Sequence, residues 1–400
     1  MRGACYRVFQ RPIIVFVRRI WVLGVMIAFI VILIGAGSIK LTTVLSSSLK
    51  NKVIVIDPGH GGADPGAQNS GLKEKDINLD ISLRLRESLE SKGCVVILTR
   101  EEDKDFYLPG FVLGRMAKRS ELDKRINMAT ENNADLFISI HTNSFPRPNT
   151  YGMETYYHLK SSPGKALAEL IQNELTRLQS DNRRKSKAGD YYLINQSKMP
   201  AVIVEVGFIS NPRERNLLLS NNYRDSIAVA IGTGIEQYFN DFPQGIRESV
   251  ETVSQEGPPA YSDGAYKLYF PSSDLESLVP EDRHINQSTW SKLTLLQKSN
   301  HVLGELIQGP LTLTSTRTIA PKTKVLSLSI QKGIAIIDFS KDIRDDFPGG
   351  ALVEDITIKS IVWSMTQLPG INGVSILING EYGDSIGGHI LLDHTFPIQP

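Results

Sequence analysis

The sequence contains few cysteines and almost no net charge. Its only two cysteines, Cys5 and Cys94, lie on either side of a long apolar segment, so we expect no intramolecular disulfide between them. The 44 lysines and arginines nearly balance the 43 aspartates and glutamates, so the charge gives no indication of a nucleic-acid-binding protein. Internal repeats are also lacking. With 41% apolar and 22% charged residues among 400, the chain is typical of a globular protein with more than one domain.

Charge is also missing from residues 20–36, which are apolar throughout. A bilayer-spanning helix needs roughly 20 such residues. The basic arm before it, residues 1–19, holds five arginines and no acid, which favours a cytoplasmic N-terminus. The sequence therefore predicts a single-pass signal-anchor over 20–38 in the cell membrane, with the catalytic part extracytoplasmic. A signal peptide cleaved near Ala36 is the alternative.

From residue 52 to 241, short apolar runs alternate with helical periodicity, which predicts an α/β domain with a mostly parallel sheet and helices on both faces. Ile77, Ile81, Leu85 and Leu89 recur every four residues and mark one helix, with Asp76 as its expected N-cap. The expected strands cover 53–56, 95–98, 134–140 and 201–206, and further helices cover 166–178 and 223–239.

Residues 242–264 are rich in Pro, Gly, Ser and Glu, a linker composition. A second, smaller α/β domain is expected over 265–400. Its predicted strands cover 267–270, 324–330, 333–339 and 374–378, and its predicted helices cover 293–306 and 352–365.

Three strands of the first domain end at chemically active residues. The first expected strand is followed by His60, the strand over 134–140 by His141, and Val202–Val204 by Glu205. The carboxyl ends of parallel strands line one crevice, where ligands bind, so these side chains could converge on a metal.

Glu74, after a glycine-rich loop, offers a further carboxylate. His60, Glu74 and His141 would form a two-histidine, one-carboxylate set with a fourth position open for water. Zinc held in this way activates water and polarises a carbonyl group. Glu205 could then act as the general base and as proton donor to a leaving amine.

Other interpretations remain open for the histidines and glycines. A single histidine is more often a surface or satisfied core residue than a ligand, and we interpret five others in this way: His158, His284, His301, His389 and His394. The glycines around His60 also resemble a phosphate-binding loop, but no Gly-Lys-Ser/Thr follows them.

The motifs DPGHGGADPGA (57–67), GLKEKDINL (71–79), DLFISIHTN (135–143) and PAVIVEVGFISNP (200–212) resemble, in the same order, those of the zinc-dependent N-acetylmuramoyl-L-alanine amidases. The resemblance implies that His60, Glu74 and His141 bind Zn²⁺ and that Glu205 is catalytic. It implies hydrolysis of the amide between N-acetylmuramic acid and L-alanine in peptidoglycan. By motif position, Asn78, Arg100 and Asn143 are candidates for substrate binding.

The segments 99–125 and 190–212 are similar to sporulation-type amidases. That similarity implies a role in spore cortex maturation, where removal of stem peptides precedes muramic-δ-lactam formation. In some members of this group, activity depends on a partner protein.

Residues 267–274 and 368–381 resemble the sporulation and germination domain of spore germination protein M. This implies a ring-building type of domain that serves assembly or localisation, with a sporulation partner or a ring complex as the expected partner of residues 265–400. A wall-binding module is the alternative. Two further functions stay open: an interaction protein with a vestigial amidase domain, and a zinc peptidase that cuts within the stem peptide.

Overall fold

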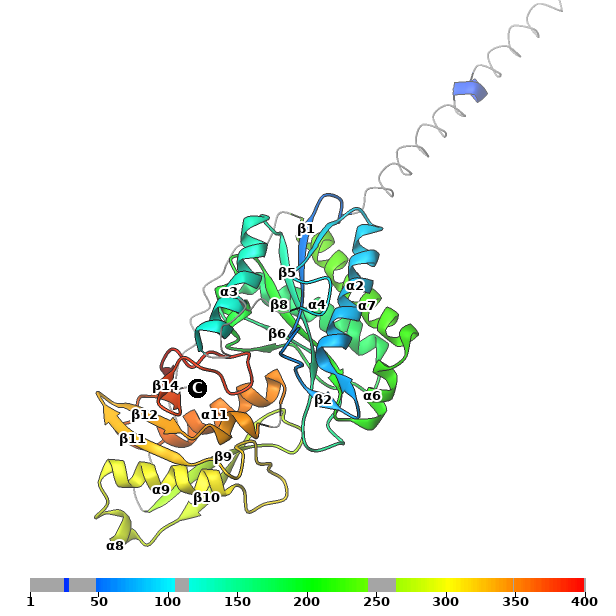
Figure 1. Ribbon diagram of the computed structural model, residues 1–400. Coiled ribbons are helices and arrows are strands. Elements are labelled where there is room, and N and C mark those ends of the chain that lie inside the picture. The colour runs from blue at the N-terminus through cyan, green and yellow to red at the C-terminus, as the bar shows by residue number, and fades with distance from the viewer. Residues whose placement is uncertain (1–24, 29–47, 105–114, 244–263, 348, 399–400) are drawn as a thin grey trace, which may run out of the picture. The chain divides into compact units, whose positions relative to one another are not determined.

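The computed structural model describes residues 25–28, 48–104, 115–243, 264–347 and 349–398 (Figure 1). The chain divides into two compact units, residues 1–50 and residues 51–400. Of the first unit, residues 25–28 are helical and exposed. The second unit holds both predicted α/β domains, whereas most of the predicted linker, residues 244–263, lies outside the described residues.

The predicted single-pass membrane anchor is not supported by the structure. Within the described ranges, no helix is long and apolar enough to cross a membrane. Of the segment 20–38, only residues 25–28 are described, and the rest lies outside the described residues. The single-pass location inferred from the apolar run and its arginines therefore has no structural basis.

The first domain is built on a six-stranded sheet in the order β4-β1-β5-β8-β6-β7. The four strands β4, β1, β5 and β8 are parallel, and β6 joins β8 in the antiparallel direction. The bounds are β1 (Val53–Pro58), β4 (Val95–Leu98), β5 (Leu136–Asn143), β6 (Glu154–Tyr157), β7 (Lys187–Ala188) and β8 (Ala201–Phe208). β1, β5 and β8 are almost wholly buried, which is typical of central parallel strands covered on both faces.

Helices cover both faces of this sheet, as predicted (Figure 1). One group packs together over one face: α2 (Glu74–Glu90), α4 (Ser162–Leu178) and α7 (Asn221–Asp241), with the short α6 (Pro212–Leu218) beside α7. The other face carries α3 (Arg115–Glu131) and α5 (Tyr192–Gln196). The four-residue spacing of Ile77, Ile81, Leu85 and Leu89 marks the buried face of α2.

Helix α2 begins three residues earlier than the sequence predicts. Its N-cap is Lys73 rather than Asp76, and the Lys73 side chain makes no capping hydrogen bond. Instead, the short hairpin of β2 (Gln68–Asn69) and β3 (Leu72–Lys73) leads directly into the helix, and Glu74 N–H donates to the Ala67 carbonyl at 2.9 Å. The carboxylate of Glu74 thus lies in the first helical turn, where the helix dipole favours negative charge.

The C-terminal domain contains two sheets with helix α11 (Ala351–Thr366) packed against both. One sheet pairs β9 (Ala265–Pro271) with β10 (Leu278–His284). The other has the order β11-β12-β13-β14, with β15 also paired to β13. The remaining elements are β11 (Val325–Gln331), β12 (Ile334–Phe339), β13 (Gly373–Ile378), β14 (Glu381–Tyr382), β15 (Phe396–Pro397), α8 (Gln287–Trp290), α9 (Leu295–Gln308) and α10 (Asp342–Asp345). The smaller α/β domain predicted from the sequence is therefore confirmed.

A buried ion pair fixes the carboxyl end of β1. Asp57 is fully buried and accepts hydrogen bonds from Thr99 Oγ1, Ser139 Oγ and Arg125 Nη1 at 2.6–2.7 Å. Burial alone would raise the pKa of Asp57, but the Arg125 charge and these hydrogen bonds outweigh it and lower the pKa. Arg125 also donates to the His60 carbonyl at 3.0 Å, so the pair joins α3 to the loop that follows β1.

We predict that Arg125→Met destabilises the protein by about 3–5 kcal/mol, because it leaves the buried Asp57 carboxylate without a counter-charge. The measurement is urea-induced unfolding of the full chain. Arg86→Met is the control, since its pair with Glu101 (67% exposed) is worth only about 0–1 kcal/mol. An equal loss of unfolding free energy in both variants would contradict a stabilising role that is specific to the buried pair.

Candidate active site

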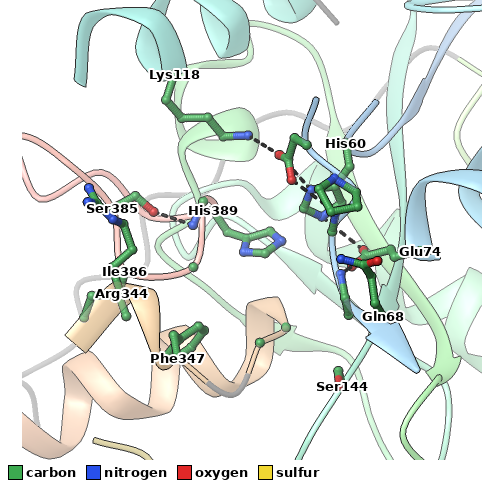
Figure 2. Close-up of a pocket in the computed structure, with 18 of the residues that line it drawn as sticks. His60, Gln68, Glu74, Lys118, Ser144, Arg344, Phe347, Ser385, Ile386 and His389 are labelled. Carbon is green, nitrogen blue, oxygen red and sulfur yellow. Dashed lines mark hydrogen bonds and ion pairs between the residues drawn. The ribbon is translucent and has the colours of Figure 1, made fainter. Parts of the chain in front are cut away.

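A cavity of about 620 Å³ lies beside the carboxyl ends of β1 and β5 (Figure 2). Residues of both domains line it, among them His60, Glu74 and Ser144 of the first domain and Phe347 and His389 of the second. Of the predicted site residues, His60 and Glu74 therefore line a cavity whose other wall comes from the C-terminal domain.

His60 occupies the turn after β1 in a left-handed backbone conformation, with φ 62°. Such a conformation is costly for a residue with a side chain, and it is typical of functional sites. The imidazole is buried, and its Nδ1 lies 2.9 Å from Asp64 Oδ2, which also accepts from Lys118 Nζ at 3.0 Å. This contact orients the ring and directs its Nε2 toward Glu74.

The Glu74 carboxylate, 2% exposed, lies between the two predicted histidine ligands. Its Oε1 is 3.2 Å from His60 Nε2 and 3.1 Å from His141 Nδ1. Backbone N–H groups of Ala67 and Thr142 donate to the same carboxylate at 2.8 and 3.0 Å. Atoms that bind one tetrahedral zinc at ~2.0–2.1 Å lie roughly 3.4 Å apart, so the spacing around Oε1 resembles that of a ligand set.

His141 and Glu205 lie side by side on neighbouring parallel strands. Strand β5 continues through His141 to Asn143 rather than ending at Ile140, and His141 is in register with Glu205 of β8. Glu205 is 1% exposed, and neither of its carboxylate oxygens has a hydrogen-bond partner in the described part of the chain. Burial, together with the charges of Glu74 and Glu154, raises the pKa of Glu205 well above its usual value.

The residues present fit a bound metal ion. Glu74 Oε1 faces two ring nitrogens at close range, and such contacts are favourable only with a proton or a cation near them. Burial would lower the pKa of His60, but Asp64 and Glu74 raise it to about 10, whereas burial lowers the pKa of His141 to about 4. A cation bound by all three groups would neutralise the carboxylate in place of the His60 proton.

The three predicted substrate-binding residues lie near this cluster but are buried. Asn78 donates to Gly59 O and Glu74 Oε1, both at 3.3 Å, and so orients the carboxylate. Arg100 donates to the carbonyls of Pro58, Gly59 and Lys75, and thereby joins the loop after β1 to α2. Asn143 accepts from Ser144 N–H, and its Nδ2 has no partner among the described residues. Contact of these side chains with substrate stays a prediction.

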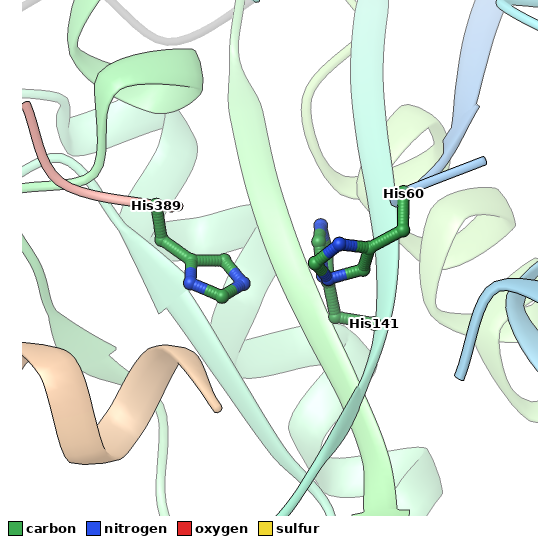
Figure 3. A group of neighbouring side chains, drawn as sticks. All are labelled: His60, His141 and His389. Carbon is green, nitrogen blue, oxygen red and sulfur yellow. The ribbon is translucent and has the colours of Figure 1, made fainter. Parts of the chain in front are cut away.

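The structure corrects one interpretation made from the sequence. His389, taken there as a surface or satisfied core histidine, lies close to His60 and His141 (Figure 3) and lines the cavity together with His60. Ligand nitrogens of the three rings all lie within 4.8 Å of one another, and all three residues are buried. Its only local signal is the preceding Gly387-Gly388, and nothing in the sequence indicates that this loop reaches the first domain.

Fold and site together define a class: an α/β enzyme with a candidate metal centre at the carboxyl edge of a largely parallel sheet. Comparison with known proteins identifies the family. Residues 54–237 match the N-acetylmuramoyl-L-alanine amidase family, and residues 267–384 match a family described as sporulation and spore germination. The chain belongs to the N-acetylmuramoyl-L-alanine amidases, as the sequence motifs predict, and members of this family are generally zinc-dependent.

Two curated relatives and one solved structure illustrate the similarity. The germination-specific N-acetylmuramoyl-L-alanine amidase of Bacillus subtilis is 37% identical over 49% of this chain and 83% of its own length. The sporulation-specific amidase of the same organism is 32% identical over 56% of this chain and 79% of its own length. The CwlD amidase of Clostridioides difficile, solved in complex with the GerS lipoprotein, is 41% identical over 48% of this chain and all of its own, with a TM-score of 0.47.

We predict that Gly59→Ala prevents the histidine cluster from holding a divalent metal ion. A Cβ at this position would overlap the His141 imidazole ring, which has no free space to move because it is buried. Metal content after dialysis against excess Zn²⁺ measures the effect. Gly304→Ala in α9 is the control, since a Cβ there meets no atom within 4 Å. Full metal content in Gly59→Ala would contradict the proposed packing.

Proposed function

We propose that this chain is a zinc-dependent amidase that hydrolyses the bond between N-acetylmuramic acid and L-alanine in peptidoglycan, during spore cortex maturation. Peptidoglycan is the substrate of amidases of this family. The observation that carries the proposal is the position of the Glu74 carboxylate between His60 and His141, next to a buried carboxylate without a partner, Glu205.

In this proposal, His60, Glu74 and His141 hold the zinc ion. Zinc supplies activation of a water molecule and polarisation of the scissile carbonyl group. Asp64 holds the His60 ring through Nδ1, and Asn78 and the Thr142 N–H hold Glu74. Contacts of this kind set the orientation and basicity of metal ligands.

Glu205 is the proposed general base. It accepts a proton from the attacking water and donates it to the amine of L-alanine as the amide bond breaks. One feature supports this role: its oxygens make no hydrogen bond within the described structure, so they are free to accept a proton from water. Its register position beside His141 keeps it near the metal ligands.

The sporulation role is supported by the relatives' names and by the C-terminal match. Two amidases similar to this chain are germination-specific and sporulation-specific, and residues 267–384 match a sporulation and spore germination family. The proposal has two further parts. Removal of the peptide precedes formation of muramic-δ-lactam, and a sporulation partner or ring complex binds residues 265–400.

We expect Glu205→Gln to retain bound zinc and lose amidase turnover by about 10²–10⁴-fold, because the ligands stay while the base is removed. His60→Ala should lose zinc as well as activity. Zinc content and the release of stem peptides with free L-alanine amino groups from peptidoglycan are the two measurements.

Glu90→Gln, an exposed change at the end of α2, is the matched control and should leave both measurements unchanged. Full turnover in Glu205→Gln would refute the general-base assignment. Cleavage inside the stem peptide would favour a zinc peptidase. Absence of any hydrolysis, even with a sporulation partner, would favour an interaction protein.

Spores whose only copy of this protein carries Glu205→Gln should contain little muramic-δ-lactam, because its formation needs glycan already freed of peptide. Chromatography of digested cortex measures the lactam. Normal lactam content would show that the enzyme acts elsewhere in the wall.

A further inference from the structure

The loop that follows β14 brings a histidine of the C-terminal domain into the proposed zinc site. The ring centroid of His389 lies 5.5 Å from that of His60 and 5.1 Å from that of His141, and the latter two are 5.1 Å apart (Figure 3). The three rings thus surround a common centre at nearly equal spacing. His389 is 8% exposed although it belongs to a loop, so the first domain and its own domain enclose it together.

His389 is held in the orientation of a metal ligand. Its Nδ1 lies 3.1 Å from Glu354 Oε2, which also accepts from the His389 backbone N–H at 2.9 Å. The opposite nitrogen, Nε2, is buried and has no hydrogen-bond partner among the residues described. Metal-binding histidines commonly donate one ring N–H to a carboxylate and use the other nitrogen as ligand, whereas an unpartnered buried nitrogen in a core destabilises the fold.

Glu354 holds the loop that carries His389 in place through several hydrogen bonds. This fully buried carboxylate of α11 also accepts from Ser385 Oγ and Gly387 N–H, both at 2.8 Å. A Cβ on Gly387 would lie 2.9 Å from Glu354 Oε2, so the close approach of the loop to the carboxylate requires glycine. The loop is therefore preorganised by its own domain.

The loop and the residues that follow it contact the first domain through polar groups and through buried apolar side chains. Tyr192 N–H donates to the His389 carbonyl at 3.1 Å, Arg119 pairs with Asp393 at 2.6 Å, and His394 Nε2 lies 3.2 Å from Asp190 Oδ2. The apolar side chains of residues 390–392 are buried in one cluster with those of residues 191–194. Arg119 is 53% exposed, and ion pairs of this kind contribute little to stability. Withdrawal of the loop therefore breaks these polar contacts and exposes apolar side chains, so we expect the closed arrangement to predominate.

We propose that His389 is the fourth ligand of the zinc ion, and that the C-terminal domain thereby keeps the amidase latent. The inference rests on the proposed zinc site of His60, Glu74 and His141. A catalytic zinc site has three protein ligands and keeps one position for water or substrate, whereas a site with four protein ligands is closed. Residues 385–389 also line the cavity, so a stem peptide that enters it would meet the loop.

Activation then consists of withdrawing the loop, by a partner that binds the C-terminal domain or by peptidoglycan itself. Minor conformations of proteins commonly have populations of 0.1–10%. An enzyme that is open for about 1–10% of the time gains about 10- to 100-fold in activity when the closing contact is removed.

The test compares the full zinc-loaded chain with His389→Ala and with the control His284→Ala, an exposed histidine of the same domain. X-ray absorption at the zinc edge should show three histidine ligands in the parent chain and in the control, and two in His389→Ala. Peptidoglycan hydrolysis without any partner should rise about 10- to 100-fold in His389→Ala alone.

Asp393→Asn leaves every ligand in place but weakens the pair with Arg119. It should therefore raise peptidoglycan hydrolysis less than His389→Ala does. Thermal unfolding of each variant checks that it is folded. Two histidine ligands in the parent chain, or lower activity in His389→Ala with zinc retained, would overturn the inference and leave the amidase proposal intact. A parent chain that binds no zinc would instead overturn the proposed function itself.

Discussion

The structure of the site depends on one buried negative charge, the carboxylate of Glu74. It closes the turn from β3 into α2, accepts two backbone N–H groups, and faces His60 and His141. Burial of a carboxylate is tolerated only with compensating donors and positive charge. This requirement brings together the loop after β1, the start of α2 and the end of β5, and a proton on His60 or a bound cation would meet it.

Much of the architecture follows from the sequence, because central strands and amphipathic helices have strong periodic signals. The face of α2 and the apolar strands β1, β5 and β8 are examples, and the order of the amidase motifs identifies the family. The position of His389 does not follow, since it depends on tertiary packing of one domain against another. The start of α2 was missed because backbone contacts of a hairpin, rather than a side-chain cap, begin it.

Three buried carboxylates perform comparable tasks in different parts of the molecule. Asp57 holds the end of β1 to α3 through Arg125, Glu74 faces two imidazoles, and Glu354 collects the donors of the loop that carries His389. Each carboxylate accepts hydrogen bonds from several donors, and these directional contacts fix the positions of the segments that carry the donors. The active site is the place where the regions fixed by these groups meet.

The covalent connection between His389 and the catalytic domain has a consequence for regulation. A ligand on the same chain is present at an effective concentration that is commonly near the millimolar range and independent of how dilute the protein is. Closure is therefore a property of each molecule from the end of its synthesis, and dilution into a compartment cannot relieve it. A partner that binds the C-terminal domain more tightly when the loop is withdrawn would open the site. The time at which the amidase becomes active then depends on when that partner appears, and not on the amount of enzyme.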